Sequence, residues 1–291
     1  MKSLKGIEAR YYNKLENNKV HCVLCPHNCH IANGGRGICG ARRNIDGVLY
    51  AESYGQISSI ALDPIEKKPL YHFYPGSYIL SAGSFGCNFR CSFCQNYSIS
   101  MGTPNTIFIP PEKLVYKAHE LKKSDNIGLA YTYNEPLISY EYVFDCCRLA
   151  KAKNLKNVLV TNGYIQEEPL REILPFIDAM NIDLKSFNND FYTKICGGNV
   201  DYVKDTILIA ARSGCHVEIT TLVIPGLNDT EEEMEELSSW LADVSPDIPL
   251  HLTRFFPRYK LTDRDLTPVE TLERLARIAG KRLKHVHLGN V

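Results

Sequence analysis

Three cysteines fall within one short loop, where Cys87, Cys91 and Cys94 have the spacing C-x3-C-x2-C. Cysteine thiolates are the usual ligands of an iron–sulfur cluster, and three of them leave one iron of a cubane uncovered for a further ligand. A zinc knuckle is the structural alternative, but it needs a fourth ligand, and residues 73–118 contain no other Cys or His. The spacing therefore predicts a [4Fe–4S] cluster with one open iron.

A second group of cysteines lies upstream with the spacing C-x2-C-x3-C-x9-C, and consists of Cys22, Cys25, Cys29 and Cys39. Four thiolates can close a metal site completely, which suits structural zinc or a second, fully ligated iron–sulfur cluster. Histidines that could replace one of these ligands are His21, His27 and His30. The spacing does not distinguish zinc from a cluster, and reduced free thiols are a third reading. Iron and zinc counts per chain would decide between them.

The elements that must position these residues follow a repeating pattern, because short apolar runs alternate with helical stretches from residue 79 onward. Strands are predicted at 78–84, 127–133, 157–162, 179–186, 216–224 and 249–256, with a seventh strand candidate in the final KHVHLGNV. Helices are predicted near 111–123, 137–153, 167–178, 199–213, 230–243 and 268–283. Six βα units in series imply parallel strands with right-handed crossovers. We therefore expect an α/β fold, a partial (β/α)6 TIM-like barrel.

The first part of the chain differs in composition from the rest, since residues 21–43 are dense in Cys, His and Gly. We expect residues 1–78 to form a Cys-rich metal-binding and β appendage, packed directly on a barrel of residues 79–291. A short helix is predicted near 7–17 within this appendage. Capping boxes at Thr230 and Thr267 predict where two of the barrel helices begin.

Polar side chains end one predicted strand after another, which is where parallel α/β barrels carry their chemistry. Asn134 and Glu135 follow the second strand, and the structural alternative to a binding role is a strand that simply ends before Pro136. Thr161 and Asn162 end the third strand, where their hydroxyl and amide groups either bind a ligand or belong to an ordinary Asn-Gly turn. The fourth strand contains the sequence NIDLKSF, in which Asp183 and Lys185 are two positions apart and so point to one face. Two opposite charges there either bind a ligand or pair with each other.

The sequence resembles the radical S-adenosylmethionine (SAM) superfamily, because the loop reads C-x3-C-x-Φ-C with Phe93 before its last cysteine. The surrounding pattern is similar to the branch that contains pyruvate formate-lyase activating enzyme. More closely, it resembles the radical SAM protein of the AmmeMemoRadiSam system, through the segments YTYNEP, VTNG, NIDLKSF, VIPGLND, HLTRFFPRY, CVLCPHNC and DPIEKKPLYHFYPGS. The likeness covers nearly the whole chain. Many members of that group continue into another Cys-containing segment, which is either absent in this version or cut away after Gly289-Asn290-Val291.

The resemblance implies a [4Fe–4S] cluster held by the three cysteines of the loop, with SAM chelating the fourth iron. One electron then cleaves SAM to methionine and a 5′-deoxyadenosyl radical, which abstracts hydrogen from a substrate. Glu135 matches the carboxylate that binds the SAM amino group, although Tyr133 and Asn134 replace the two glycines of that motif. The positions that match SAM contacts are Phe93, Asn134, Glu135, Thr161, Asn162, Asp183, Lys185 and Ile224.

The substrate stays open at this point. A glycine in a partner glycyl-radical enzyme is one alternative, and a small molecule or another protein is the other. His251 and Arg254, in the last clear strand, are candidate catalytic residues, though a lone strand His is more often structural. An electron donor of the flavodoxin or ferredoxin type is the expected partner. A non-catalytic iron–sulfur or zinc protein is the alternative of a different class.

Composition narrows the remaining classes of function. Lys plus Arg and Asp plus Glu both number 33 in 291 residues, so the net charge of zero gives no general attraction to nucleic acid or to an anionic membrane. The longest apolar runs are far short of a membrane span, and the first residues lack the apolar core of a signal peptide. We therefore expect a cytoplasmic protein with reduced cysteines.

Overall fold

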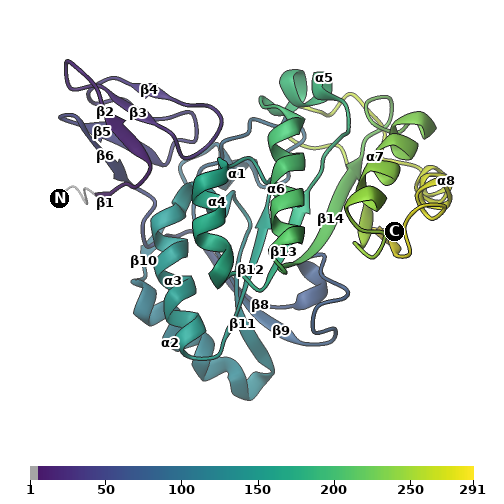
Figure 1. Ribbon diagram of the computed structural model, residues 1–291, viewed down its shortest axis with the longest axis horizontal. Coiled ribbons are helices and arrows are strands. Elements are labelled where there is room, and N and C mark those ends of the chain that lie inside the picture. Colours follow the sequence, from purple (N-terminus) through teal and green to yellow (C-terminus); the bar gives the residue numbers. More distant parts are fainter. Residues whose placement is uncertain (1–5) are drawn as a thin grey trace.

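The computed structural model describes residues 6–291, and an open eight-stranded sheet forms its centre (Figure 1). Seven strands run parallel in chain order: β9 (Tyr78–Gly83), β11 (Asn126–Tyr131), β12 (Lys156–Thr161), β13 (Ala179–Asp183), β14 (His216–Val223), β15 (Leu250–Arg254) and β16 (Val286–Gly289). An antiparallel strand, β8 (Ser59–Pro64), extends the sheet beyond β9. The predicted partial barrel of βα units is confirmed, and the last segment of the chain does add a seventh parallel strand.

Helices connect the parallel strands and cover the outer face of the sheet, as Figure 1 shows for α3, α4 and α6. The longer helices are α2 (Pro111–Glu120), α3 (Tyr140–Ala152), α4 (Glu167–Ile173), α6 (Val200–Arg212), α7 (Glu231–Val244) and α8 (Val269–Ala279). Short helical turns are α1 (Tyr97–Ser100), α5 (Asn189–Phe191), η1 (Ile65–Lys67), η2 (Leu121–Ser124), η3 (Pro136–Ser139), η4 (Leu174–Phe176) and η5 (Tyr192–Cys196).

The two predicted capping boxes have different outcomes. The Thr230 side chain accepts a hydrogen bond from the Glu233 amide at 3.2 Å and caps α7 as predicted. The prediction for Thr267 is wrong, because α8 begins after Pro268 without a side-chain cap. The Thr267 hydroxyl instead donates to the Val223 carbonyl at 2.6 Å, so it joins the ends of two strands rather than capping a helix.

The chain before β8 forms two small antiparallel sheets that lie to one side of the barrel (Figure 1). One has the order β2 (Tyr12–Lys14), β3 (Val20–Cys22), β4 (His30–Ile31), and the other the order β1 (Ile7–Glu8), β6 (Val48–Ala51), β5 (Arg42–Ile45). A further pair joins β7 (Gln56–Ile57) to β10 (Ile107–Phe108). The helix expected near 7–17 is therefore wrong. Tyr11, Asn17 and Asn18 have positive φ angles, which a right-handed helix excludes and a tight β turn uses.

The small sheets are fastened to the barrel by a buried ion pair. Arg42 on β5 donates to Glu141 on α3 at 2.5 Å, and both side chains are almost fully buried. Because β8 also precedes residue 78 and yet belongs to the large sheet, the division into residues 1–78 and 79–291 stays a proposal. Within the described residues, no helix has the length and apolarity to cross a membrane.

Candidate active site

The loop that carries Cys87, Cys91 and Cys94 follows β9 at the carboxyl end of the sheet, and backbone hydrogen bonds hold it from two sides. The Arg90 amide donates to the Cys196 carbonyl at 2.7 Å, and the Cys87 amide donates to the Cys39 carbonyl at 3.2 Å. The first bond ties the loop to the turn η5, and the second ties it to the N-terminal cysteine segment. The loop is therefore preorganised by segments far away in sequence.

Gly86 permits this close approach of the two cysteine segments. Its φ is 85°, in the left-handed region that favours glycine, and a Cβ there would lie 2.5 Å from the Cys39 carbonyl oxygen. The Asn134 side chain braces the same place, because its amide donates to the Gly86 carbonyl at 3.0 Å and its oxygen accepts from the Ser84 amide at 2.8 Å. Asn134, which we expected at SAM, is thus already used to hold the cysteine loop.

The three sulfurs of the loop suit an iron–sulfur cluster by their chemistry and surroundings. In the absence of a metal, burial raises the pKa of Cys87 well above its usual range, with Glu135 and Cys91 adding to the effect, so iron must displace the proton of this thiol. The Phe89 amide and the Asn162 side-chain amide point at the Cys87 sulfur, at 3.3 and 3.6 Å, which is how clusters are commonly tuned. Within residues 6–291, no group of three His, Cys, Asp or Glu side chains stands ready to hold a metal ion, so the ligand assignments stay predictions.

Glu135 lies at the centre of a buried network next to this loop. Its carboxylate accepts from the Thr161 hydroxyl at 2.7 Å, the Asn162 amide at 2.8 Å and the Leu137 amide at 3.0 Å. Burial raises the pKa of the Glu135 carboxyl to about 7, although these three donors oppose the shift. The structure therefore brings three predicted residues together, and uses the Thr161 hydroxyl to orient the carboxylate.

The residue before Asn134 explains how the chain does without the expected glycines. Tyr133 has a φ of 73°, which favours glycine, and its hydroxyl donates to Asp63 on β8 at 2.7 Å. Lys68 donates to the same carboxylate at 2.8 Å and lies over the Tyr133 ring. These contacts hold Tyr133, two residues after the end of β11, in a backbone conformation that costs energy for any residue except glycine.

Asp183 and Lys185 form an ion pair at the end of β13, with Nζ and Oδ2 2.8 Å apart. Burial lowers the pKa of the Lys185 ammonium, but Asp183 and Cys91 raise it by more, so the pKa lies well above its usual range. The Lys185 ammonium also lies 5.8 Å from the centre of the Phe93 ring, which places it beside the cysteine loop. The ion pair between Asp183 and Lys185, which we expected as the structural alternative to ligand binding, is therefore present, and it lies at the candidate site.

The remaining predicted residues are spread over two ends of the sheet. Ile224 is fully buried just after β14, where its amide donates to the Asn228 side chain at 2.7 Å. Arg254 ends β15 and donates to the Thr267 carbonyl at 2.7 Å. His251 lies near the amino end of β15, and its Nε2 is 2.6 Å from Glu218. The structure does not bring His251 to the cysteine loop.

The N-terminal cysteines also gather. A Cβ on Gly37 would lie 3.7 Å from the Cys39 sulfur and 3.9 Å from the Cys29 sulfur. Burial raises the pKa of Cys25 to about 12, and the other three thiols of the group add to the shift. Of the histidines considered as ligands, His27 instead contacts the Asn88 carbonyl of the cysteine loop, at 2.7 Å.

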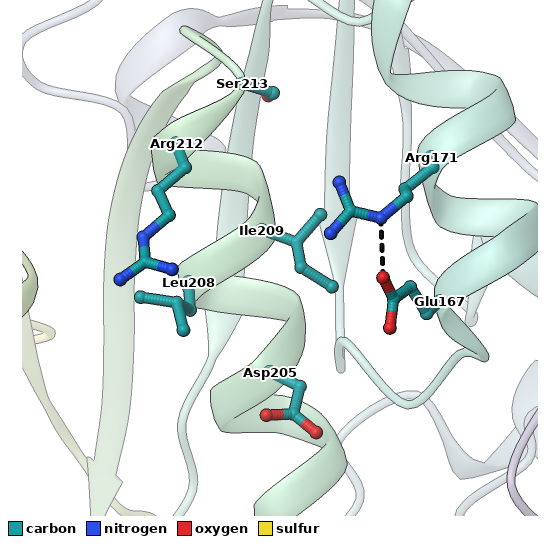
Figure 2. A pocket seen from close by; sticks show the side chains of 7 residues that line it. All are labelled: Glu167, Arg171, Asp205, Leu208, Ile209, Arg212 and Ser213. Atoms are coloured by element: carbon teal, nitrogen blue, oxygen red, sulfur yellow. Dashed lines mark hydrogen bonds and ion pairs between the residues drawn. The ribbon is translucent and has the colours of Figure 1, made fainter.

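Cavities occur both near the cysteine loop and away from it. One of about 360 Å³ is lined by Gln95, next to Cys94, and by the segment after β15; its other lining residues are Phe256, Pro257, Arg258 and Asn290. Another of about 340 Å³ lies on the outer helical layer between α4 and α6 (Figure 2). The second is lined by Arg171 paired with Glu167 and is formed by different elements from the cysteine site.

Comparison with known proteins identifies this arrangement. The sequence profile described as the radical SAM superfamily matches residues 83–241, more than half of the chain. The chain belongs to the radical SAM superfamily. It is 45% identical over 289 residues to the uncharacterized protein MJ0808 of Methanocaldococcus jannaschii, covering 98% of this chain and 85% of that one. It is 25% identical over 162 residues to the pyruvate formate-lyase-activating enzyme of Clostridium pasteurianum, covering 55% of this chain and 67% of that enzyme.

A solved structure with the same fold is a radical SAM methyltransferase from Sphaerobacter thermophilus, with a TM-score of 0.59 and 18% identity. It covers 74% of this chain and 67% of the other. At this identity the likeness shows the fold alone. The resemblance to the superfamily and to its activating-enzyme branch is thus confirmed, and the chain is an enzyme of radical SAM type, whereas the closer likeness to the AmmeMemoRadiSam protein stays a prediction.

One residue at this radical SAM site escaped the sequence reasoning. Cys196, fully buried in η5, lies beside Cys91, and the contact between the two thiols is the largest cause of the raised pKa of Cys91. Its isolated position in the sequence gave no sign of this. The Gly197-Gly198 pair that ends the turn was the available signal, because Gly198 packs against Phe89 of the cysteine loop.

Proposed function

We propose that this radical SAM enzyme cleaves SAM reductively and uses the product radical to abstract hydrogen from a substrate. The observation that carries the proposal is the convergence of the cysteine loop, Glu135 and the Asp183–Lys185 pair at one end of the sheet. The chemistry that a [4Fe–4S] cluster supplies in such a site is the one-electron cleavage of SAM to methionine and a 5′-deoxyadenosyl radical.

Glu135 is the group we assign to the amino group of SAM. A carboxylate offers about four acceptor positions, and the donors Thr161, Asn162 and Leu137 occupy three of them. One position remains for an N–H donor. A charged pair in this buried place is stronger than one in water, because the local dielectric is low. The network thus holds Glu135 in the orientation in which that remaining position is available.

Lys185 and Asp183 carry opposite charges, and we assign each of them to groups of SAM that its charge attracts. The Lys185 ammonium stays charged in its buried place and suits the SAM carboxylate, while Asp183 suits hydroxyl or amino donors. Asn162 and Thr161 hold the shape of the site, and we assign the segment that begins at Ile224, directly after β14, to the adenine ring. Phe93 packs beside Lys185 and limits the access of water.

The N-terminal cysteines form a second proposed metal site, either structural zinc or a second iron–sulfur cluster. Its support is the gathering of Cys22, Cys25, Cys29 and Cys39 next to the first loop. All of the cysteines in the described residues are free thiols, which suits a reducing compartment, and we place the enzyme in the cytoplasm. Iron and zinc counts after anaerobic purification distinguish the two metals, because only a second cluster raises the iron content.

The substrate class is the finer part of the proposal. Two relatives named as activating enzymes, the one from Clostridium pasteurianum and the putative glycyl-radical enzyme activating enzyme of Methanocaldococcus jannaschii, favour a protein glycine as one alternative. A small molecule or another protein, as the likeness to the AmmeMemoRadiSam system would imply, is the other. An electron donor of the flavodoxin or ferredoxin type is the proposed partner. Transfer of deuterium from labelled candidates into 5′-deoxyadenosine identifies the substrate.

The central experiment measures 5′-deoxyadenosine and methionine formed by anaerobically reconstituted, reduced protein with SAM. We expect both products from the unchanged chain and from Cys215→Ala, which removes a half-buried thiol far from the loop in sequence. We expect neither product from Cys87→Ala, together with a loss of iron. The proposal is refuted if the unchanged protein forms no 5′-deoxyadenosine and Cys87→Ala alters neither iron content nor SAM affinity.

A further inference from the structure

Five of the nine histidines gather at the amino ends of the parallel strands, away from the cysteine loop. They surround the buried carboxylate of Glu218 and are His72, His216, His251, His285 and His287, which we call the histidine cluster. Three lie at the starts of β14, β15 and β16, and His285 directly precedes β16. Imidazole is the commonest metal ligand among protein side chains and suits zinc, copper, iron and nickel.

His72 enters the cluster from the segment that connects β8 to β9. Its Nε2 lies 2.9 Å from Nε2 of His287 on β16, although the two residues are 215 positions apart. β8 and β16 are the two edges of the open sheet. The contact between these imidazoles therefore bridges the two edges that the sheet itself leaves unpaired.

Glu218 fixes the segment that carries His72. Its carboxylate accepts from the Tyr71 amide at 3.0 Å and from the His72 amide at 2.8 Å. The Nε2 atoms of His216 and His251 contact the same carboxylate at 2.9 and 2.6 Å. Glu218 thus occupies these two histidines and leaves the other three imidazoles of the cluster for a different ligand.

We propose that His72, His285 and His287 bind a divalent transition-metal ion of the zinc class. The two Nε2 atoms are 2.9 Å apart, and a separation of about 3.3 Å suits two nitrogens that each stand about 2.0–2.1 Å from a shared tetrahedral zinc, so a small rotation of either ring suffices. His287 lies on β16, and His285 lies two positions earlier, directly before the first residue of that strand. The ring of His285 is centred 4.5 Å from that of His72, which places it within reach as the third ligand.

Binding requires a side-chain rotation, because within the described part of the chain no three such side chains already converge on one point. His285 is only half-buried and His72 is exposed, so both can turn, and an ion can reach them from solvent. A metal binds imidazole in its neutral form, through a ring nitrogen that carries no proton.

The consequence of such a site is a clamp across the open barrel. A metal held by His72 from the β8–β9 connection and by His285 and His287 from the last strand joins the two edges of the sheet at its amino end. Because the ion binds the folded chain and not the separated segments, it stabilises the fold in proportion to its occupancy. This site is independent of the cysteine loop and of SAM.

The test uses Zn²⁺ and the cluster-loaded protein. Equilibrium dialysis at fixed free Zn²⁺, followed by metal analysis, compares the unchanged chain with His72→Gln and His287→Gln. His119→Gln is the matched control, since it removes an exposed histidine from α2 by the same substitution. We expect the unchanged chain and the control to hold one more zinc than the two variants, with affinity at least tenfold lower in each variant. Added Zn²⁺ should raise the midpoint of thermal unfolding of the unchanged chain and of the control, and not that of the two variants.

Equal zinc contents in all four chains overturn the proposal, and His72 and His287 then share only a hydrogen bond. A measurement on the unchanged chain covers the case in which a variant fails to fold. Diethylpyrocarbonate labelling, located by mass spectrometry, should show Zn²⁺ protecting His72, His285 and His287 while His119 stays reactive. Unaltered labelling of these three residues at saturating Zn²⁺ would equally reject the site.

Discussion

The buried ion pair between Arg42 and Glu141 allows a quantitative prediction about how the cysteine-rich segment is attached. Arg42 donates to Glu141 at 2.5 Å, and its other nitrogens donate to the carbonyls of Arg10 and Ile138. The Arg42 side chain is 1% exposed and that of Glu141 is 3% exposed. Each charge therefore depends on the other, since neither has access to water.

The expected magnitude follows from what a single substitution leaves behind. In Arg42→Met, the Glu141 carboxylate keeps only the Arg10 amide at 2.7 Å, and its second oxygen already has no hydrogen-bond partner within the described residues. An uncompensated buried charge of this kind costs about 3–5 kcal/mol of folding free energy. Replacing both partners, as in Arg42→Met with Glu141→Leu, removes the stranded charge and should recover most of that loss.

Urea unfolding followed by circular dichroism measures these differences. The exposed pair of Arg171 and Glu167, 61% and 65% exposed, supplies the matched control, and Arg171→Ala should cost less than about 1 kcal/mol. The reasoning is refuted if Arg42→Met costs no more than this control. It is also refuted if the double variant is destabilised by the sum of the single variants, because the two charges would then not be coupled.

Three further predictions concern the two ends of the sheet. Glu135→Gln should weaken SAM binding by about ten- to a hundredfold in calorimetry, the equivalent of one charged hydrogen bond, and an unchanged affinity would remove Glu135 from the SAM site. Gly86→Ala should lose iron on reconstitution, because its Cβ meets the Cys39 carbonyl, whereas Gly76→Ala, with a φ of 81° and open space, should keep it. Burial raises the pKa of Glu218, but hydrogen bonds from His216 and His251 lower it by more, from 4.5 to about 2. This shift implies about 3 kcal/mol of folding stability, which is present above pH 4.5 and is lost as the pH falls toward 2. Urea midpoints of Glu218→Gln and the unchanged chain should therefore converge over that interval.

The periodicity of the sequence was sufficient to predict the barrel. Each predicted parallel strand appears within a few residues of its expected position, because buried parallel strands read as apolar runs between helical stretches. The N-terminal segment was less predictable. Residues 7–17 contain good helix formers, but the positive φ angles at Asn17 and Asn18 turn the chain into a hairpin, and pairing with β3 outweighs local propensity.

The spacing of the cysteine loop was sufficient to indicate the radical SAM superfamily, whereas the surroundings of the loop could not be predicted. The contact of Cys91 with Cys196 and the hydrogen bond from the Cys87 amide to the Cys39 carbonyl join segments whose spacing in the chain carries no pattern. His251 shows a related limit. Alternation along a strand indicates which face a residue occupies, but its depth in the barrel depends on the stagger between strands, which no single strand encodes.

The two ends of the sheet impose different conditions on a substrate. At the amino end, the segment carrying Tyr71 and His72 is anchored to Glu218, so this end is closed across the barrel. At the carboxyl end, the cavity of about 360 Å³ beside Gln95 lies next to the cysteine loop. The edges β8 and β16 are not paired with each other. Contacts nevertheless cross the barrel at both ends, because His72 contacts His287 at the amino end and the Lys260 amide donates to the Ser92 carbonyl at 3.0 Å at the carboxyl end. If the proposed function is correct, a substrate approaches from the carboxyl end, because the cysteine loop and this cavity both lie there.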